Sequence, residues 1–249
     1  WKQWAEDGAR QMVESGTTAA ADIVTDLDAA GALASQGMHG IAYWEVMGWH
    51  NAEWMEKGRT ELIRQLRRMN EEQLPNLGIS PHAPYTLESE PFVDLPDIAR
   101  QLNMRLHIHL AETPLEAGTY PPVLTTYSAA DWSDHDWESY RQLKEVGKGA
   151  SAIQFVDQLG SLGPDVHIAH GVWANGEDRR ILRQRGVGVA LCPRSNRITN
   201  TGKDAPVREY LEEGNLVSVG TDSLSSTPTL DLLDDVSMLY DLALSLIHI

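Results

Sequence analysis

Short apolar runs alternate with amphipathic segments along the chain, and this alternation restricts the fold more than any other feature. The strand candidates are Thr18–Thr25, Gly40–Met47, Leu77–His82, Arg105–Ala111, Val166–His170, Val187–Cys192 and Leu216–Gly220. Helical periodicity is found in the segments between them, at Trp1–Glu14, Glu53–Met69, Pro91–Leu102, Glu177–Arg185, Val207–Glu213 and Leu230–Leu242. Strands that alternate with helices in this way are typical of βαβ units in a parallel sheet. Seven strands in 249 residues therefore predict an α/β fold, a (β/α)8 TIM-type barrel that lacks one strand.

Residues 1–249 are expected to form a single barrel domain. A long connection, residues 113–149, interrupts the alternation and contains the acidic aromatic cluster DWSDHDW. Connections of this length often act as lids or binding loops, and an exposed insertion without a role in chemistry is an equal alternative. Three polar residues stand where helix N-caps belong, namely Asn51, Asn175 and Thr229.

Charge and cysteine content exclude several classes of protein. The formal charge of −16 argues against nucleic acid or an anionic membrane surface as a partner, because both require clustered Lys and Arg. No stretch is long and apolar enough to span a bilayer. The single cysteine, Cys192, rules out an intrachain disulfide and suits a reducing compartment, so we expect a cytoplasmic protein. These features are compatible with a homo-oligomer.

Four ionisable residues stand at the carboxyl ends of predicted strands. His82, His109 and His170 lie at or near the ends of three strands, and Asp222 follows the last one. A single histidine at a strand end is more often a hydrogen-bonded core residue, and a single Asp after a strand is often an N-cap. In a parallel barrel, however, the carboxyl ends of all strands meet at one rim, where active sites form. We therefore expect the four side chains to converge.

The run LHIHLAET suggests which ligand this rim binds. Leu106, Ile108 and Leu110 share one face of the strand, and the other face carries His107 and His109. If the leucines pack against the surrounding helices, both histidines face the barrel interior. Imidazole and carboxylate groups together suit one divalent ion such as Zn²⁺ or Fe²⁺ better than Ca²⁺ or Mg²⁺.

Five strings, SPHAPYT, HIHLAET, AHGVW, CPRSN and VGTDS, occur in this order and resemble motifs of the amidohydrolase superfamily. The resemblance is closest to the branch of purine and pyrimidine aminohydrolases and triazine chlorohydrolases, and it covers about Gly16 to Asp235. It implies one metal ion at the mouth of a (β/α)8 barrel.

The resemblance also implies a role for each rim residue. His109 and Asp222 are expected to be metal ligands, and Asp222 also accepts a proton from the attacking water. His170 is expected to polarise or orient that water. Glu112 is expected to move protons and contact the substrate, and His82 to contact the substrate. His107 has no assigned role beyond support of the ligands, and Glu45 is a further pocket candidate.

The sequence departs from the family pattern at its first strand. The family supplies two more ligands from an HxH pair on that strand, and the only HxH pair here is His107–His109 itself. The accessory β-sandwich of the family is also missing, so we interpret the chain as truncated at both ends and expect it to be inactive on its own. The predicted activity of the parent is deamination of an amino-substituted nitrogen heterocycle, such as an adenine-type nucleoside. The alternatives are a chlorohydrolase acting on triazine-like rings and a catalytically inactive truncated barrel.

Overall fold

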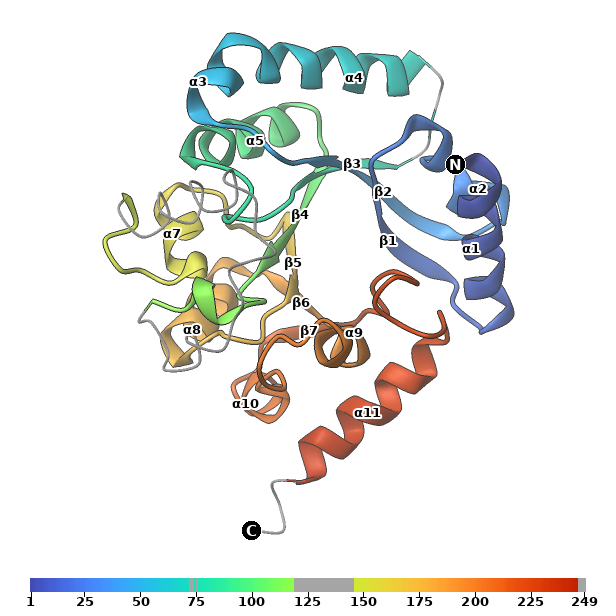
Figure 1. Cartoon of the computed structure of the whole chain (residues 1–249), viewed down its shortest axis with the longest axis vertical. Coiled ribbons are helices and arrows are strands. Elements are labelled where there is room, and N and C mark those ends of the chain that lie inside the picture. The colour runs from blue at the N-terminus through green and yellow to red at the C-terminus, as the bar shows by residue number, and fades with distance from the viewer. Residues whose placement is uncertain (72–73, 75, 119–145, 246–249) are drawn as a thin grey trace.

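Seven parallel strands form one curled sheet. The computed structural model describes residues 1–71, 74, 76–118 and 146–245, so residues 119–145 of the predicted lid-like loop lie outside the described residues. The strands pair in chain order and curl around a common interior (Figure 1). Their bounds are β1 Ala19–Val24, β2 His39–Val46, β3 Leu77–Pro81, β4 Arg105–Leu110, β5 Val166–His170, β6 Gly188–Leu191 and β7 Leu216–Val219. All seven predicted strands are confirmed.

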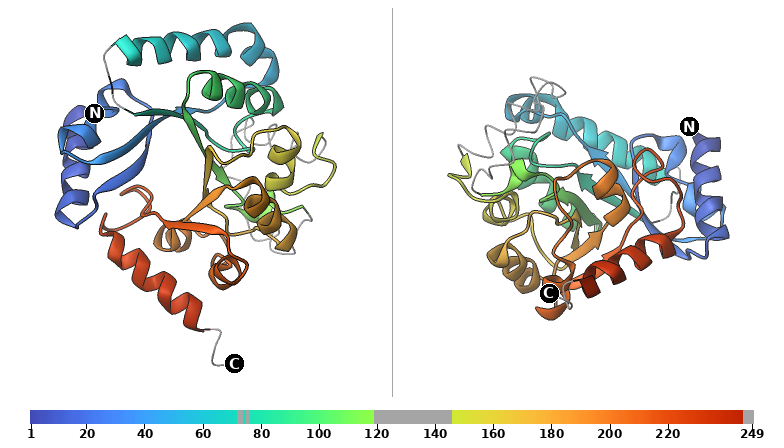
Figure 2. Two further views of the ribbon diagram at one scale, coloured as in Figure 1. Left: turned by 180° about the vertical axis from the view of Figure 1, so that it is seen from behind. Right: turned by 60° about the horizontal axis from the view of Figure 1, so that its bottom comes forward.

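Helices surround the outside of the curled sheet, as the views from both sides show (Figures 1 and 2). The longer ones are α1 Lys2–Glu14, α4 Arg59–Glu71, α5 Ser89–Gln101, α8 Gly176–Arg185 and α11 Leu232–Ser245. The shorter ones are α2 Ala32–Ser35, α3 Asn51–Glu53, α7 Ala152–Gln158, α9 Pro193–Ile198 and α10 Val207–Glu212. Short helical turns are η1 Leu27–Ala29, η2 Trp54–Gly58, which is π-helical, and η3 Pro114–Glu116. Among the described residues, no helix combines the length and apolar character needed to cross a membrane.

The two faces of β4 show why the sheet curls around a polar interior. Leu106, Ile108 and Leu110 are fully buried in the hydrophobic core between the sheet and the helices. The opposite face carries His107 and His109. The ring of His107 packs edge-on against the ring of Tyr43 in β2, with 5.4 Å between the ring centroids. The aliphatic face therefore holds the strand against the helices, and the histidines face the inside of the curl.

The barrel is incomplete. In the described part of the chain the sheet begins at β1 and ends at β7, and each inner strand pairs with its neighbours in sequence. The seven strands thus form the curled part of a TIM-type barrel, as the sequence predicts. Unpaired backbone groups along β1 and β7 make these strands the edges of the sheet.

Two of the three predicted N-caps are wrong. Asn175 is confirmed, since its side chain accepts hydrogen bonds from the N–H groups of Glu177 and Asp178. Asn51 lies inside α3 and its Oδ1 accepts instead from the N–H of Glu90, in the first turn of α5. Thr229 lies before α11, where Asp231 accepts the hydrogen bond from Leu233. The partner of Asn51 depends on the packing of loops, which local sequence does not specify, whereas the cap of α11 is a local contact two residues further along the chain than Thr229.

The Asp22 carboxyl gives the fold a measurable dependence on pH. Burial raises the pKa of Asp22 to about 6. Because the folded state then binds a proton more tightly than the unfolded chain, the stabilising contribution is complete below about pH 4 and is lost as the pH rises through about 6. We expect the free energy of unfolding of D22N, measured by urea denaturation, to vary less between pH 4 and 6 than that of the wild type. Parallel profiles for the two proteins would contradict this account.

Candidate active site

The predicted rim residues converge at the carboxyl ends of the strands. His82 follows β3, His109 lies near the end of β4, and His170 ends β5. The ring centroid of His109 lies 4.8 Å from that of His82. The ring of His109 also stacks on the ring of His170, with 5.5 Å between the two centroids. Three imidazoles from three strands thus form one continuous cluster.

Hydrogen bonds and burial fix the state of His109. Its Nδ1 lies 3.1 Å from the carbonyl oxygen of His82, so Nδ1 donates and Nε2 carries the lone pair. Burial and the neighbouring His170 lower the pKa of His109, although Glu112, the His82 carbonyl and Asp222 act in the opposite direction. The result is a neutral imidazole with a free Nε2, which is the form that binds a metal.

Glu112 lies between Tyr85 and His170. The Tyr85 hydroxyl donates to Oε2 of Glu112 at 2.8 Å, and Oε1 lies 3.7 Å from Nε2 of His170. His170 is 2% exposed, its Nδ1 donates to Oδ1 of Asn196 at 2.9 Å, and its Nε2 is the ring nitrogen that faces Glu112. The carboxylate therefore lies beside the histidine cluster with one oxygen held by a hydroxyl and the other next to an imidazole.

Asp222 is held by the loop that follows β7 and by the turn that follows β6. Its Oδ2 accepts from the hydroxyls of Ser195, at 2.6 Å, and Ser226, at 3.0 Å, and its Oδ1 accepts from the N–H of Ser223. Burial raises the pKa of Asp222, but these hydrogen bonds and the nearby His170 outweigh burial and lower the pKa below its usual value. Asp222 is therefore an ionised carboxylate near neutral pH.

Three residues at this rim have left-handed backbone conformations, although none is glycine. The φ angles are 54° at Ala111, 73° at His170 and 62° at Asp222. A left-handed conformation costs an L-residue roughly 1–2 kcal/mol. Such strain concentrates at functional sites, where the surrounding contacts enforce it. Here it redirects the chain at the ends of β4, β5 and β7.

The donor set at the rim fits a divalent metal ion. In the described part of the chain, donor atoms of Glu45, His82 and His109 all lie within 4.8 Å of one another. Asp222 does not belong to that group, although its charge affects the pKa of His109. These three donors form a possible metal site, and the expectation that His109 and Asp222 hold Zn²⁺ or Fe²⁺ stays a prediction.

His82 and Glu45 face each other across β2 and β3. Nε2 of His82 lies 4.0 Å from Oε1 of Glu45, and Nδ1 of His82 bonds to the Thr86 hydroxyl at 2.8 Å. Burial, with His109 and His170, lowers the pKa of His82 to about 3, and burial raises the pKa of Glu45. His82 therefore favours its neutral form, which is suited to a hydrogen bond with a neutral ligand.

His107 is buried and lies two residues before His109 on β4, further from the carboxyl rim. Its Nδ1 is buried and has no hydrogen-bond partner among the described residues, and burial lowers its pKa well below the usual value. Its ring contacts those of Tyr43 and His109. The role of His107 in supporting the metal ligands stays a prediction.

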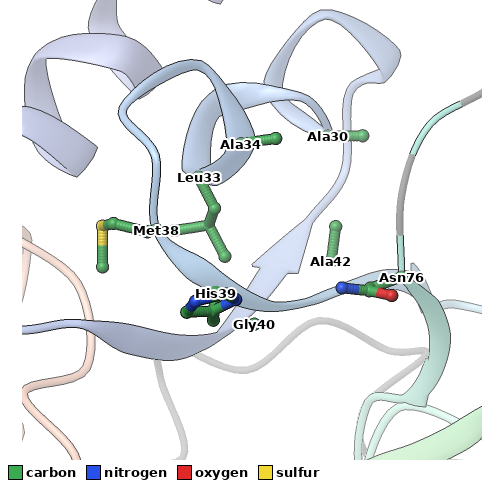
Figure 3. A pocket seen from close by; sticks show the side chains of 8 residues that line it. All are labelled: Ala30, Leu33, Ala34, Met38, His39, Gly40, Ala42 and Asn76. Carbon is green, nitrogen blue, oxygen red and sulfur yellow. The ribbon is translucent and has the colours of Figure 1, made fainter.

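A small cavity lies at the opposite end of the sheet and is separate from this site. Its volume is about 90 Å³, and its lining includes His39, at the start of β2, and Asn76, which precedes β3 (Figure 3). It is too small for a heterocyclic substrate, and active sites of parallel barrels lie at the carboxyl end.

Sequence analysis missed four residues that hold the rim groups in place. Tyr85 binds Glu112, Ser195 binds Asp222, Asn196 binds His170, and Glu116 accepts hydrogen bonds from the backbone next to Glu112. Tyr85 stands three residues after His82, and Ser195 and Asn196 belong to the CPRSN turn. In the structure Ser195 and Asn196 belong to α9 and Glu116 belongs to η3, and their place in segments that follow strands was the available signal.

A curled sheet of parallel strands with imidazoles and carboxylates at its carboxyl rim defines an incomplete barrel of the TIM type. The model of the amidohydrolase family matches residues 1–119 and 125–248, and the chain belongs to this family. Among its relatives is a 5-methylthioadenosine/S-adenosylhomocysteine deaminase from Thermococcus kodakarensis. The two are 30% identical over 235 residues, which are 93% of this chain and 49% of the relative. The chain thus spans about half the length of the curated relatives it matches.

Solved structures share the fold. A zinc-bound adenosine deaminase from Xanthomonas campestris superposes with a TM-score of 0.73 at 22% identity, over 99% of this chain and 52% of that one. An atrazine chlorohydrolase from Arthrobacter aurescens, complexed with zinc and atraton, has a TM-score of 0.70 at 20% identity. The match covers 94% of this chain and 52% of the chlorohydrolase chain. At these identities the likeness establishes the barrel fold.

Proposed function

We propose that this chain is the catalytic barrel of a metal-dependent hydrolase that deaminates an adenine-type nucleoside or a related amino-substituted heterocycle. The observation that carries the proposal is the placement of Glu112, which lies beside the His82–His109–His170 cluster and is held by Tyr85. The family assignment and the deaminases among the relatives support it.

We propose that His109, through Nε2, and Asp222 hold one divalent ion. The zinc in the related adenosine deaminase structure supports Zn²⁺, and Fe²⁺ suits the same donors. A divalent ion bound there lowers the pKa of water toward ~7, so that hydroxide is available at neutral pH.

The proposed mechanism uses each remaining group for one task. His170 polarises or orients the attacking water through Nε2, and Asp222 accepts the proton of that water. Glu112 starts protonated and gives its proton to the ring nitrogen as the adjacent carbon is attacked. It then moves the proton of the new hydroxyl group to the departing amine, and the water proton held by Asp222 returns to Glu112, so that both carboxyl groups regain their starting states. His82 binds the substrate as a neutral group. The net reaction is a hydrolysis, in which one water is consumed, ammonia leaves and a ring carbonyl remains.

Product analysis tests the proposal. The family resemblance implies an HxH pair on a strand upstream of β1, so we define the extended form as this chain preceded by such a strand. The extended form, loaded with Zn²⁺ or Fe²⁺, is incubated with 5′-methylthioadenosine, S-adenosylhomocysteine, adenosine and a chlorotriazine. Ammonia from the nucleosides is the expected result. Chloride alone would favour the chlorohydrolase, and neither product would favour a catalytically inactive barrel.

The phenol of Tyr85 is expected to assist Glu112. Y85F removes the hydrogen bond to Oε2 of Glu112 and retains the ring that packs edge-on against His82. A hydrogen bond to a charged group contributes ~1.5–3 kcal/mol, so kcat should fall about tenfold or more. The measurement is the rate of ammonia release by the extended form at saturating substrate. A kcat within twofold of wild type would remove Tyr85 from the mechanism.

We also propose a cytoplasmic location and a small-molecule partner. The thiol of Cys192 is free and buried, and burial raises its pKa above the usual range. A protein with this single free cysteine needs no oxidising compartment. The charge of −16 supports a neutral heterocycle over nucleic acid as the partner.

A further inference from the structure

Glu116 is a buried carboxylate that the proposed chemistry does not use. Its exposed fraction is 0%, and its side chain turns back toward the end of β4. Oε1 accepts from the N–H of Ala111 at 2.8 Å, and Oε2 accepts from the N–H groups of Glu112, at 2.8 Å, and Thr113, at 2.9 Å. One carboxylate thus binds three consecutive backbone amides, and the middle one belongs to Glu112.

The segment that Glu116 holds is strained and is fixed from a second side. Ala111 has a φ of 54°, and its carbonyl oxygen accepts from the N–H of Trp173 at 2.7 Å. The preceding carbonyl, of Leu110, accepts from the N–H of Gly171. An alanine remains in this conformation only where its neighbours enforce it. Among the described residues, the Glu116 carboxylate accepts hydrogen bonds from three N–H groups of this turn, those of Ala111, Glu112 and Thr113.

We infer that Glu116 is a positioning residue that fixes the backbone of Glu112 and so directs its carboxylate toward His170 and the substrate. The inference rests on the proposed function, because it assigns Glu116 a role in the step that Glu112 performs. Burial raises the pKa of Glu116 to about 7. The charge of Glu112 also raises this pKa, whereas the N–H groups of Thr113, Ala111 and Glu112 lower it. The two carboxylates are therefore close enough to interact.

Glutamine is the informative replacement. E116Q keeps the size of the side chain, but the amide offers one acceptor oxygen to three N–H groups, and its NH₂ must face at least one of them. The chain also offers a matched control in Asp178, another fully buried carboxylate that accepts a backbone N–H, that of Asn175, at a helix start. Asp178 bonds to Ser151 and Gln154 and contacts none of the rim groups.

The first measurement needs neither metal nor substrate. Hydrogen exchange of the Ala111, Glu112 and Thr113 amides is followed by NMR in the 249-residue chain. Loss of a charge-assisted hydrogen bond should speed exchange of these amides roughly tenfold or more in E116Q, with no such change in D178N. Equal exchange in E116Q and wild type would overturn the inference. If E116Q does not fold, E116D, which keeps the charge but shortens the reach, replaces it in the same comparison.

The second measurement is a double-mutant cycle in the extended form. If Glu116 acts through Glu112, E116Q lowers kcat roughly tenfold or more with little change in KM, and adds little to the loss already present in E112Q. D178N leaves kcat within about twofold of wild type. A full additional loss in the double variant, or an unchanged kcat in E116Q, would overturn the inference. An inactive wild type would instead count against the proposed function, and the exchange experiment would still test the backbone contacts.

Discussion

Replacement of Glu112 by glutamine is expected to lower kcat by a factor of about 10²–10⁴, the usual scale for loss of a general acid–base group. Glutamine is nearly isosteric and can still accept from Tyr85, but it cannot carry a proton from water to the ring or to the departing amine. Because Glu112 is proposed to contact substrate and not metal, the metal content of E112Q should equal that of wild type. Both quantities are measured on the extended form.

The matched control for this variant is E88Q. Glu88 is also a buried glutamate beside a histidine, His50, and it accepts from the backbone N–H of Asn51. E88Q should therefore alter stability and leave kcat nearly unchanged. A kcat of E112Q near that of E88Q, or loss of metal from E112Q, would remove Glu112 from the proposed role.

Substitution of the proposed ligands is expected to remove the metal. H109A deletes the free Nε2, and D222A deletes the ionised carboxylate that Ser195 and Ser226 hold. Catalytic zinc sites need about three protein ligands, so loss of one should reduce the metal content of the extended form from about one ion per chain to a small fraction. Elemental analysis after gel filtration measures this content.

The control for the ligand variants is H39A. His39 lies at the start of β2, beside the small cavity at the amino end of the sheet. Its loss should leave the metal content unchanged. Full metal content in a folded H109A or D222A protein would show that other groups bind the ion. The group formed by Glu45, His82 and His109 would then be examined first.

The sequence predicted the strands well because each carries a strong local signal. In β4, Leu106, Ile108 and Leu110 alternate with two histidines, and the structure buries these three residues in the core. The same regularity predicted that His82, His109 and His170 would meet, since parallel strands end at one rim. Helix α7 was missed, because seven residues after a long connection give little periodicity.

The contacts that orient the rim groups were not predictable from local sequence. Asn51 resembles an N-cap of its own helix but bonds to the start of α5, because loops from β2 and β3 pack together. Ser195 reaches Asp222 only because β6 and β7 are adjacent. Glu116 stands in a Thr113-x-x-Glu capping box, which predicts its bond to the Thr113 N–H, but its bonds to the N–H groups of Ala111 and Glu112 require the turn at Ala111.

The most direct test of the account is metal-dependent ammonia release from an adenine-type nucleoside. The extended form and the 249-residue chain are stripped of metal with a chelator, titrated with Zn²⁺ or Fe²⁺, and assayed with 5′-methylthioadenosine. The account predicts that the extended form releases ammonia in proportion to bound metal, that E112Q binds the same metal without comparable activity, and that the 249-residue chain binds metal poorly and is inactive. Equal ammonia release with and without the chelator, or equal activity of the two forms, would contradict it.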